Sequence, residues 1–147
     1  MKKYNRYPTR DPIKNYFPLP NEIFCLGLCS GELSVYSYLL YREDRKTFQC
    51  WPSYKTIGNA LKMSRNTVRK YVDMLVDKQL ITTEYTDVFT QKGEKRNGTL
   101  KYTLRPIQEA VEHFHQRQLE VLEREQAKAE AKRRLEDYDR RHGYMVG

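Results

Sequence analysis

A cluster of polar side chains follows Ser64 in a segment with helical periodicity. Arg and Asn carry the donors and acceptors that pair with guanine and adenine edges in a DNA major groove, and Lys and Thr bind phosphate oxygens. A serine at a helix start caps the helix and leaves backbone N–H groups facing outward, where they attract phosphate. The candidate residues are Ser64, Arg65, Asn66, Thr67, Arg69 and Lys70. Their chemistry is that of nucleic-acid recognition.

Two further segments extend this set of candidates. Lys55 lies in the first turn of the preceding predicted helix, where it can contact a phosphate. Segment 91–97 holds Lys92, Lys95 and Arg96, which can meet a phosphate backbone or a minor groove, or can simply be solvated. Asp73 would repel phosphate, so the reading face should end before it.

Three predicted helices position the main cluster. Helical spacing of apolar residues predicts them over 30–43, 54–61 and 65–78. The expected capping residues are Ser30, Ser53 and Ser64. In the third helix the apolar side is formed by Val68, Val72 and Leu75, which places the polar cluster on the outward side.

After the third helix, apolar residues recur at every second position, as in a strand. Segment 80–85 and segment 99–104 are predicted strands, and the polar segment 87–98 between them is predicted to be an exposed hairpin loop. Pro106 ends the second strand and can open a last helix in its first turn, over about 107–138.

The last helix has an apolar stripe that fades midway. A heptad repeat counted from Phe114 would place several charged residues at the positions that face the partner helix. Such an interface is too polar for a coiled coil. Oppositely charged pairs four residues apart instead favour a single solvated helix. These pairs are Glu120 with Arg124 and Glu130 with Arg134.

Three helices followed by a strand, a basic loop and a strand are the element order of a winged helix-turn-helix. The stretch 52–81 resembles the helix-turn-helix of GntR-class repressors, and 33–81 is similar to the DNA-binding domain at the front of phage and plasmid replication proteins. The resemblance implies a mainly α fold with a small β-hairpin. Lys62 and Gln79 stand where glycine is common in this pattern, at positions where a positive φ is convenient.

The chain is expected to form one compact domain with two appendages. Residues 1–20 are a basic arm rich in Pro and Tyr, 21–106 are the winged helix-turn-helix domain, and 107–147 are a charged helix and tail. The arm has five basic residues that can lie along DNA: Lys2, Lys3, Arg6, Arg10 and Lys14. Three further residues of the arm are expected to pack onto the domain: Tyr16, Phe17 and Leu19.

The positive charge lies in the folded part of the chain. The chain has 27 Lys and Arg against 19 Asp and Glu, a formal net charge of +8. Residues 1–106 hold 19 of the basic and 10 of the acidic residues, whereas 107–147 hold 8 basic and 9 acidic ones. A localised positive field favours a polyanionic partner, although it could also serve solubility alone.

Other kinds of site find little support. Cys25, Cys29 and Cys50 lack a fourth ligand nearby for zinc and are expected to be reduced thiols. No grouping of side chains suggests catalysis, so the protein is expected to be no enzyme and to need no cofactor. With no charged and apolar leader and no long apolar span, it is expected to be cytoplasmic and to bind no membrane.

The sequence therefore predicts binding of double-stranded DNA in a bacterium or one of its mobile elements. In the first hypothesis the protein is a transcriptional regulator, and the last helix pairs two copies so that two half-sites about one turn apart are read. In the second it assists replication or partition of a plasmid, phage or conjugative element. The third is a winged helix that binds protein only. No segment suggests a small-molecule ligand.

Overall fold

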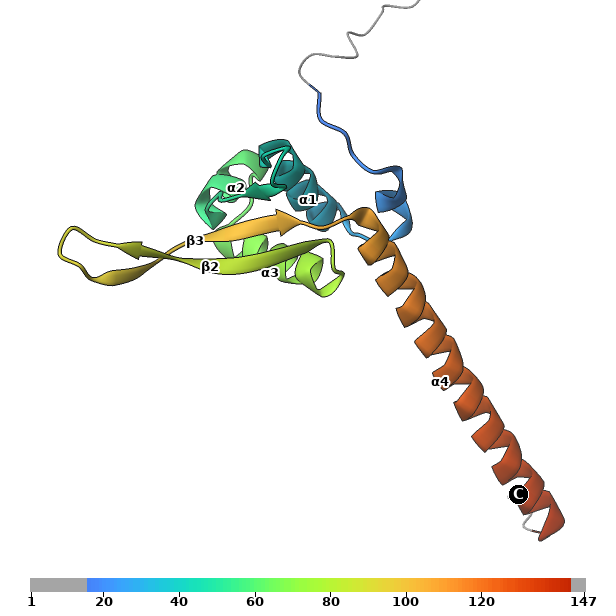
Figure 1. Cartoon of the computed structure of the whole chain (residues 1–147). Helices are drawn as coiled ribbons and strands as arrows, with labels where there is room; N and C mark the ends of the chain where they lie inside the picture. Colours follow the sequence, from blue (N-terminus) through green and yellow to red (C-terminus); the bar gives the residue numbers. More distant parts are fainter. Residues whose placement is uncertain (1–15, 144–147) are drawn as a thin grey trace, which may run out of the picture.

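The computed structural model describes residues 16–143, apart from the side chains of Val88, Arg96 and Asn97. The elements in chain order are η1 (Asn21–Cys25), α1 (Ser30–Arg42), β1 (Gln49–Cys50), α2 (Tyr54–Leu61), α3 (Arg65–Asp77), β2 (Ile81–Phe89), β3 (Lys95–Leu104) and α4 (Ile107–Arg141). Figure 1 shows α1, α2 and α3 gathered around one half of a twisted hairpin, with α4 leaving this body as a rod. The predicted winged helix-turn-helix with a long C-terminal helix is confirmed.

The two serine caps of the helix-turn-helix form as predicted. The backbone N–H of Thr56 donates to Ser53 Oγ at 3.1 Å, and that of Thr67 donates to Ser64 Oγ at 3.2 Å. Each bond satisfies one N–H that a helix start leaves without an intrahelical partner. The starts of α2 and α3 are therefore fixed by local sequence.

The turn between α2 and α3 depends on a close approach of backbone. A Cβ at Gly58 would lie 2.4 Å from the carbonyl oxygen of Met63, so only glycine fits there. Lys62 ends α2 in the left-handed region with φ 58°, and Gln79 does the same after α3 with φ 61°. Both positions where glycine was expected thus adopt the positive φ that glycine would favour.

The start of α1 differs from the prediction. The capping position is Cys29, not Ser30, and Ser30 is the first residue of the helix. Glu32 explains the difference, because its Oε1 accepts the backbone N–H of Cys29 at 3.2 Å, as an acidic residue does three positions after a cap. A cap at Ser30 would have placed Leu33 at that position instead.

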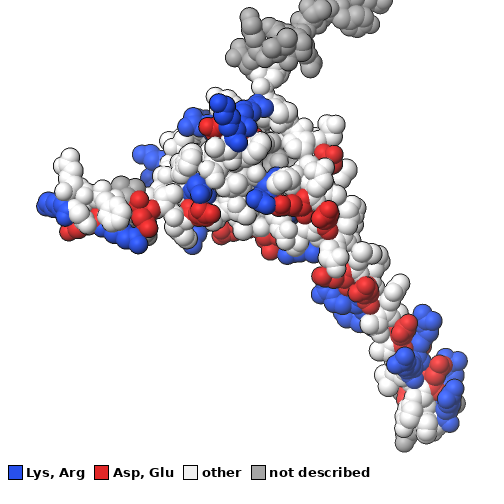
Figure 2. Space-filling view, in the orientation of Figure 1, with Lys and Arg blue, Asp and Glu red and all other residues white. Residues whose placement is uncertain are grey.

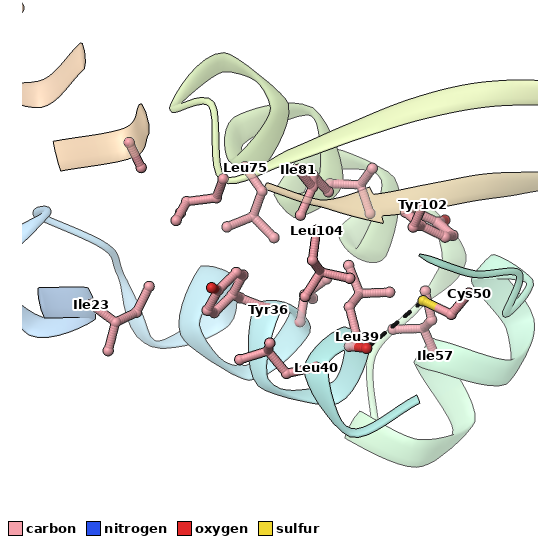
Figure 3. Close-up of a cluster of buried hydrophobic side chains, with 14 of the residues drawn as sticks. Ile23, Tyr36, Leu39, Leu40, Cys50, Ile57, Leu75, Ile81, Tyr102 and Leu104 are labelled. Atoms are coloured by element: carbon pink, nitrogen blue, oxygen red, sulfur yellow. Dashed lines mark hydrogen bonds between the residues drawn. The ribbon is translucent and has the colours of Figure 1, made fainter. Parts of the chain in front are cut away.

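One apolar core joins the three helices to the base of the sheet. Figure 3 shows α1 side chains facing residues of α2, α3 and the strands, with the Cys50 thiol donating to the carbonyl oxygen of Leu39 at 3.8 Å. Val68, Val72 and Leu75 are buried, as predicted for the inner side of α3. The other large buried side chains include Ile23, Tyr36, Leu39, Ile57, Leu80, Ile81 and Tyr102.

The sheet has one strand more than predicted. Its order is β1, β3, β2, and all pairings are antiparallel. The extra strand β1 pairs Gln49 with Thr103 and Cys50 with Tyr102. It was not predicted because two residues are too short for an alternating pattern, and their strand geometry comes from pairing with a distant segment.

The hairpin is also longer than predicted. Strand pairing continues to Phe89 opposite Lys95, so most of the predicted loop over 87–98 is strand and only a short turn remains. A register shift between Tyr85 and Asp87 marks a bulge. The outer half was misread because a hairpin with both faces in solvent needs no apolar alternation.

Helix α4 joins the body only through its beginning. It follows Pro106, which stands just before the first helical residue rather than within the first turn, and extends beyond the predicted end to Arg141. Ala110 is buried and Phe114 packs against the core, while almost every later residue is exposed. Arg117 binds both carboxylate oxygens of Asp77 at 3.1 Å.

The predicted ion pairs within α4 do not form. Arg124 donates instead to the backbone oxygen of Glu120 at 3.4 Å, and among the described residues no ion pair joins Glu130 to Arg134. The ion pairs that α4 does make include Arg105 with Glu109 and Arg140 with Asp137.

The N-terminal arm lies partly outside the described residues, including all five of its basic residues up to Lys14. Leu19 packs against the core, and the ring of Phe17 lies 6.0 Å from that of Tyr41. Tyr16, also expected to pack, is exposed. Two of the three expected contacts of the arm with the domain are therefore present.

Candidate nucleic-acid interface

The polar cluster lies on the outer side of α3, at the end where the helix begins. Arg65, Asn66, Arg69 and Lys70 are exposed. The buried valines and leucine on the opposite side of the same helix hold it against the body, so these four side chains point away from the core. Lys70 lies with its Nζ 5.5 Å from the centre of the Tyr71 ring.

Two of the predicted site residues serve the helix itself. The hydroxyls of Ser64 and Thr67 are 2.8 Å apart, and Ser64 Oγ also accepts the backbone N–H of Thr67. Thr67 is half-buried, while Ser64 is exposed. Both side chains fix the first turn of α3, and the first backbone N–H groups of the helix lie beside Arg65.

The start of α2 adds a second cationic position. Lys55 is exposed in the first turn of α2, next to the cap at Ser53. The N-terminal end of α2, like that of α3, carries the positive end of a helix dipole. A phosphate placed there would meet both the dipole and the Lys55 ammonium.

The wing, defined here as the hairpin of β2 and β3, carries charge of both signs. Lys92 is exposed in its turn, but Lys95 pairs with Asp87 at 3.3 Å and Lys101 with Glu84 at 2.8 Å. The side chain of Arg96, a predicted contact, lies outside the described residues. Figure 2 shows positive and negative side chains together along the wing, so the wing is less strongly positive than its lysines alone suggest.

A groove of about 350 Å³ lies between α2, α3 and the wing. Its lining includes Ser53, which caps α2, Tyr54 from α2, Arg69 from α3, and Tyr85 from β2. Tyr85 is 79% exposed. The pKa of Tyr54 is raised, mainly by burial and secondly by the nearby charge of Asp73, whereas Arg69 opposes the rise. The groove thus joins the outer face of α3 to the wing.

Sequence reasoning placed Tyr85 on a strand but not in this groove. Its aromatic side chain suited a predicted strand equally well, and its position beside Arg69 depends on how the hairpin folds over α3. Tyr54, the first residue of α2, was not predicted to line such a groove either. A cue for both was available in the unusual number of tyrosines, 12 in the chain, but their spacing did not single out these two.

The cysteines and other possible metal ligands do not gather at this surface. Cys25 and Cys29 are exposed and Cys50 is buried. Burial raises the pKa of Cys50 to about 11, with Glu43 adding to the rise. Within residues 16–143 no group of three or more His, Cys, Asp or Glu side chains is placed to bind a metal ion. The same part of the chain contains no helix with the length and apolarity needed to cross a membrane.

Comparison with known proteins gives one family match. Residues 26–81 match the model of a family described as a helix-turn-helix domain, from just before α1 to the first residue of β2. No curated protein sequence is detectably similar to the chain. The match covers the segment that carries Arg65, Asn66 and Arg69, and it ends before most of the wing and all of α4.

Several solved structures are similar in part. A possible transcriptional regulator from Methanosarcina mazei Go1 is 19% identical, with 71% of this chain and 82% of that chain covered and a TM-score of 0.47. MepR of S. aureus, in a complex with DNA, is 19% identical with 80% and 86% covered and a TM-score of 0.40. The adhesin competence repressor of Streptococcus pyogenes is 16% identical with 84% and 85% covered and a TM-score of 0.39.

The winged helix-turn-helix assignment itself comes from the element order and the family match. The resemblance to GntR-class repressors and replication proteins stays a prediction.

Proposed function

We propose that this protein binds double-stranded DNA in a sequence-specific way and acts as a transcriptional regulator. The observation that carries the proposal is the exposure of Arg65, Asn66 and Arg69 on the outer side of a helix whose inner side is fully buried. A capped helix held in this way has the size and chemistry to enter a major groove. Bound near a promoter, such a protein would control transcription by occupying its site.

The side chains have different roles in this proposal. Arg65 and Arg69 pair with guanine and Asn66 with adenine, because these side chains can make two hydrogen bonds to those base edges. The remaining residues bind the backbone and fix the register. They are Lys55, Ser64, Thr67, Lys70, Lys92, Lys95 and Arg96.

Ser64 and Thr67 act through the first turn of α3 rather than through free hydroxyls. Their hydroxyls already bond to each other, so what they offer a phosphate is the set of oriented backbone N–H groups at the helix start. Tyr85, at the other side of the groove from Tyr54, adds an aromatic surface for the sugar and phosphate chain.

The protein is proposed to act as a homodimer, since a recognition helix of this kind reads only a few base pairs and two copies read a two-fold symmetric site. A role in replication or partition of a mobile element would use the same DNA surface, with α4 engaging other proteins. A promoter-proximal site favours regulation, whereas a site within a replication origin favours the second role.

The deciding experiment is selection of bound duplexes from a random pool, followed by fluorescence anisotropy of the selected duplex at several salt concentrations. Phosphate-dominated binding should fall by orders of magnitude as salt rises to about 300 mM. Arg65→Ala and Arg69→Ala should abolish selection of the consensus. Arg141→Ala removes a matched exposed cation at the far end of α4 and should leave binding unchanged.

The wing is tested separately with Arg96→Ala, which should weaken binding to the selected duplex and to random duplex alike, and should reduce the salt slope by about 0.9. Unchanged affinity for both duplexes would remove this residue from the interface. Failure to select any consensus, with equal weak binding by wild type and Arg65→Ala, would reject sequence-specific recognition. Binding that survives high salt would favour a protein partner.

A further inference from the structure

The side of α4 that packs on the body continues beyond it without a partner. Residues three or four positions apart lie on one side of a helix. From Phe114, which packs against the core, this side passes through Val121 and Leu122 and later through Leu135. Leu122 and Leu135 are 53% and 63% exposed, although they occupy the same side as the half-buried Phe114. We call this side the α4 stripe.

A groove of about 590 Å³ opens where the α4 stripe leaves the body. Leu26 and Gly27, which follow η1, form one wall, and Phe114, Gln118 and Leu122 form the other. The groove exposes mainly apolar surface and lies directly in line with the unpartnered part of the helix. An element that covered the α4 stripe would also reach this groove.

The charges on the α4 stripe change sign along its length. Glu125 comes first, and Lys128 and Lys132 follow. All three are exposed, and none of them takes part in the ion pairs found within the described residues. Of the charged residues of α4 up to Glu125, five are acidic and two basic, whereas from Lys128 to Arg141 six are basic and four acidic.

This pattern distinguishes the two ways in which a pair of such helices could pack. In a parallel pair each position faces its own copy, so Glu125 would meet Glu125, and Lys132 would meet Lys132, with repulsion at both levels. In an antiparallel pair centred between Lys128 and Ala129, Glu125 of each helix faces Lys132 of the other, so the pair has two such contacts. The same alignment brings Leu122 of each copy opposite Leu135 of the other.

We infer that two copies of this chain pair through antiparallel α4 stripes, with the C-terminal end of each α4 lying against the groove of the other copy. Lys128 and Ala129 flank the two-fold axis, where the small side chain of Ala129 allows close approach and leaves room for the stem of Lys128. The inference specifies the homodimer on which the proposed function relies. The partner is thus a second copy, selected by its complementary order of charges.

The pairing sets the distance between the points at which the two α4 helices leave their domains. At 1.5 Å per residue, the two copies of Ala110, where α4 leaves the core, would be separated by about 55 Å along the helix pair. This exceeds the roughly 34 Å of one DNA turn. This separation applies to the start of α4 in each copy, and the half-site spacing of a selected consensus also depends on where α3 lies relative to that point.

The first test measures oligomeric state by sedimentation of the full chain without DNA, up to about 100 µM because dimer formation depends on concentration. Glu125→Lys and Lys132→Glu each place like charges opposite one another and should weaken the dimer by about 10-fold. The double variant restores the opposite charges and should recover it. Glu130→Lys makes the same charge change on the other side of α4 and is the matched control.

A monomeric wild type would overturn the inference, and so would a double variant as weak as either single change or a Glu130→Lys variant as weak as Glu125→Lys. A parallel dimer predicts no difference between wild type, single and double variants, since each position then faces its own copy. Circular dichroism of each variant confirms that α4 remains helical.

A second test fixes the direction by disulfide formation, with Cys25 and Cys29 changed to Ser. Chains carrying Leu122→Cys mixed with chains carrying Leu135→Cys should cross-link under mild oxidation, whereas Leu122→Cys alone should not. The reverse result would overturn the antiparallel order. Binding to a duplex with a single half-site is measured in parallel, so that loss of the dimer is distinguished from loss of DNA recognition.

Discussion

Lys78 Nζ lies 2.6 Å from Glu32 Oε2 and joins the end of α3 to the start of α1. Glu32 is only 1% exposed and also accepts the backbone N–H of Cys29. Burial alone would raise the pKa of Glu32, but the hydrogen bonds from Lys78 and Cys29 outweigh it and leave that pKa below its ordinary value. The helix that carries Arg65, Asn66 and Arg69 is thus fixed at its far end by an ion pair whose carboxylate is buried.

Lys78→Met should destabilise the protein because it leaves the buried Glu32 carboxylate without its cation. The free energy of unfolding in urea should fall by about 3 kcal/mol at neutral pH. Lys92→Met removes an exposed cation from the wing turn and should change stability little. Adding Glu32→Gln to Lys78→Met should recover part of the loss, and no recovery would mean that Lys78 acts by packing alone.

The same pair predicts a pH dependence. The lowered pKa of Glu32 means that the unfolded chain takes up the proton first as pH falls. The stabilisation is therefore complete well above the ordinary carboxyl pKa of 4.5 and is lost as pH falls through the lower folded-state value. Urea titrations between neutral and strongly acidic pH should show a smaller acid-dependent loss in Glu32→Gln than in wild type.

Gly58→Ala should disrupt the turn of the helix-turn-helix. The added Cβ would lie 2.4 Å from the Met63 carbonyl oxygen, so α2 and α3 must separate locally. We expect a loss of about 2 kcal/mol together with weaker DNA binding. Asn59→Ala, an exposed change in the same helix, should leave both unchanged. A Gly58→Ala variant with the melting temperature of wild type would contradict the close approach.

Lys62→Gly should stabilise the protein, unlike most substitutions. Lys62 adopts a φ of 58° at the end of α2, a conformation that strains a residue with a side chain. Relief of this strain should raise the free energy of unfolding by about 1 kcal/mol. Lys55→Gly, within a helix and at negative φ, should instead destabilise. Thermal unfolding of the two variants provides the comparison.

Asp87→Asn should strengthen DNA binding by releasing Lys95, which pairs with Asp87 at 3.3 Å. A lysine freed in this way can neutralise one more phosphate, so the salt slope should rise by up to about 0.9. Asp137→Asn breaks a comparable exposed pair with Arg140 at the far end of α4 and removes the same charge. If both variants bind DNA with the same affinity, the increase over wild type reflects the change in net charge and not the release of Lys95.

The sequence was most informative where structure is set by neighbours in the chain. The caps at Ser53 and Ser64 and the outward side of α3 follow from residues within a few positions, and they were predicted correctly. The cap at Cys29 was missed because it depends on Glu32, which is held in turn by Lys78 from a distant helix. Strand β1 likewise depends on a partner strand more than fifty residues later.

The geometry of the candidate interface was predicted only in part, for the same reason. Exposure of Arg65, Asn66 and Arg69 follows from helical periodicity alone. The groove that brings Tyr85 beside Arg69 arises from the way the hairpin lies across α3, which no local pattern encodes. The pairing of Lys95 with Asp87 needed the cross-strand register, because the predicted loop left both residues unpaired.

The bulge between Tyr85 and Asp87 divides the wing into an inner and an outer part. The inner part shares its register with buried residues such as Ile81 and Tyr102, so its length cannot change without shifting the core. The outer part lies between the bulge and the turn, and its residues Asp87, Phe89 and Lys95 are exposed. Insertions or exchanges there would alter how far the hairpin extends along a bound duplex while the rest of the domain keeps its shape, which makes the outer wing the natural place for related chains to diverge in target preference.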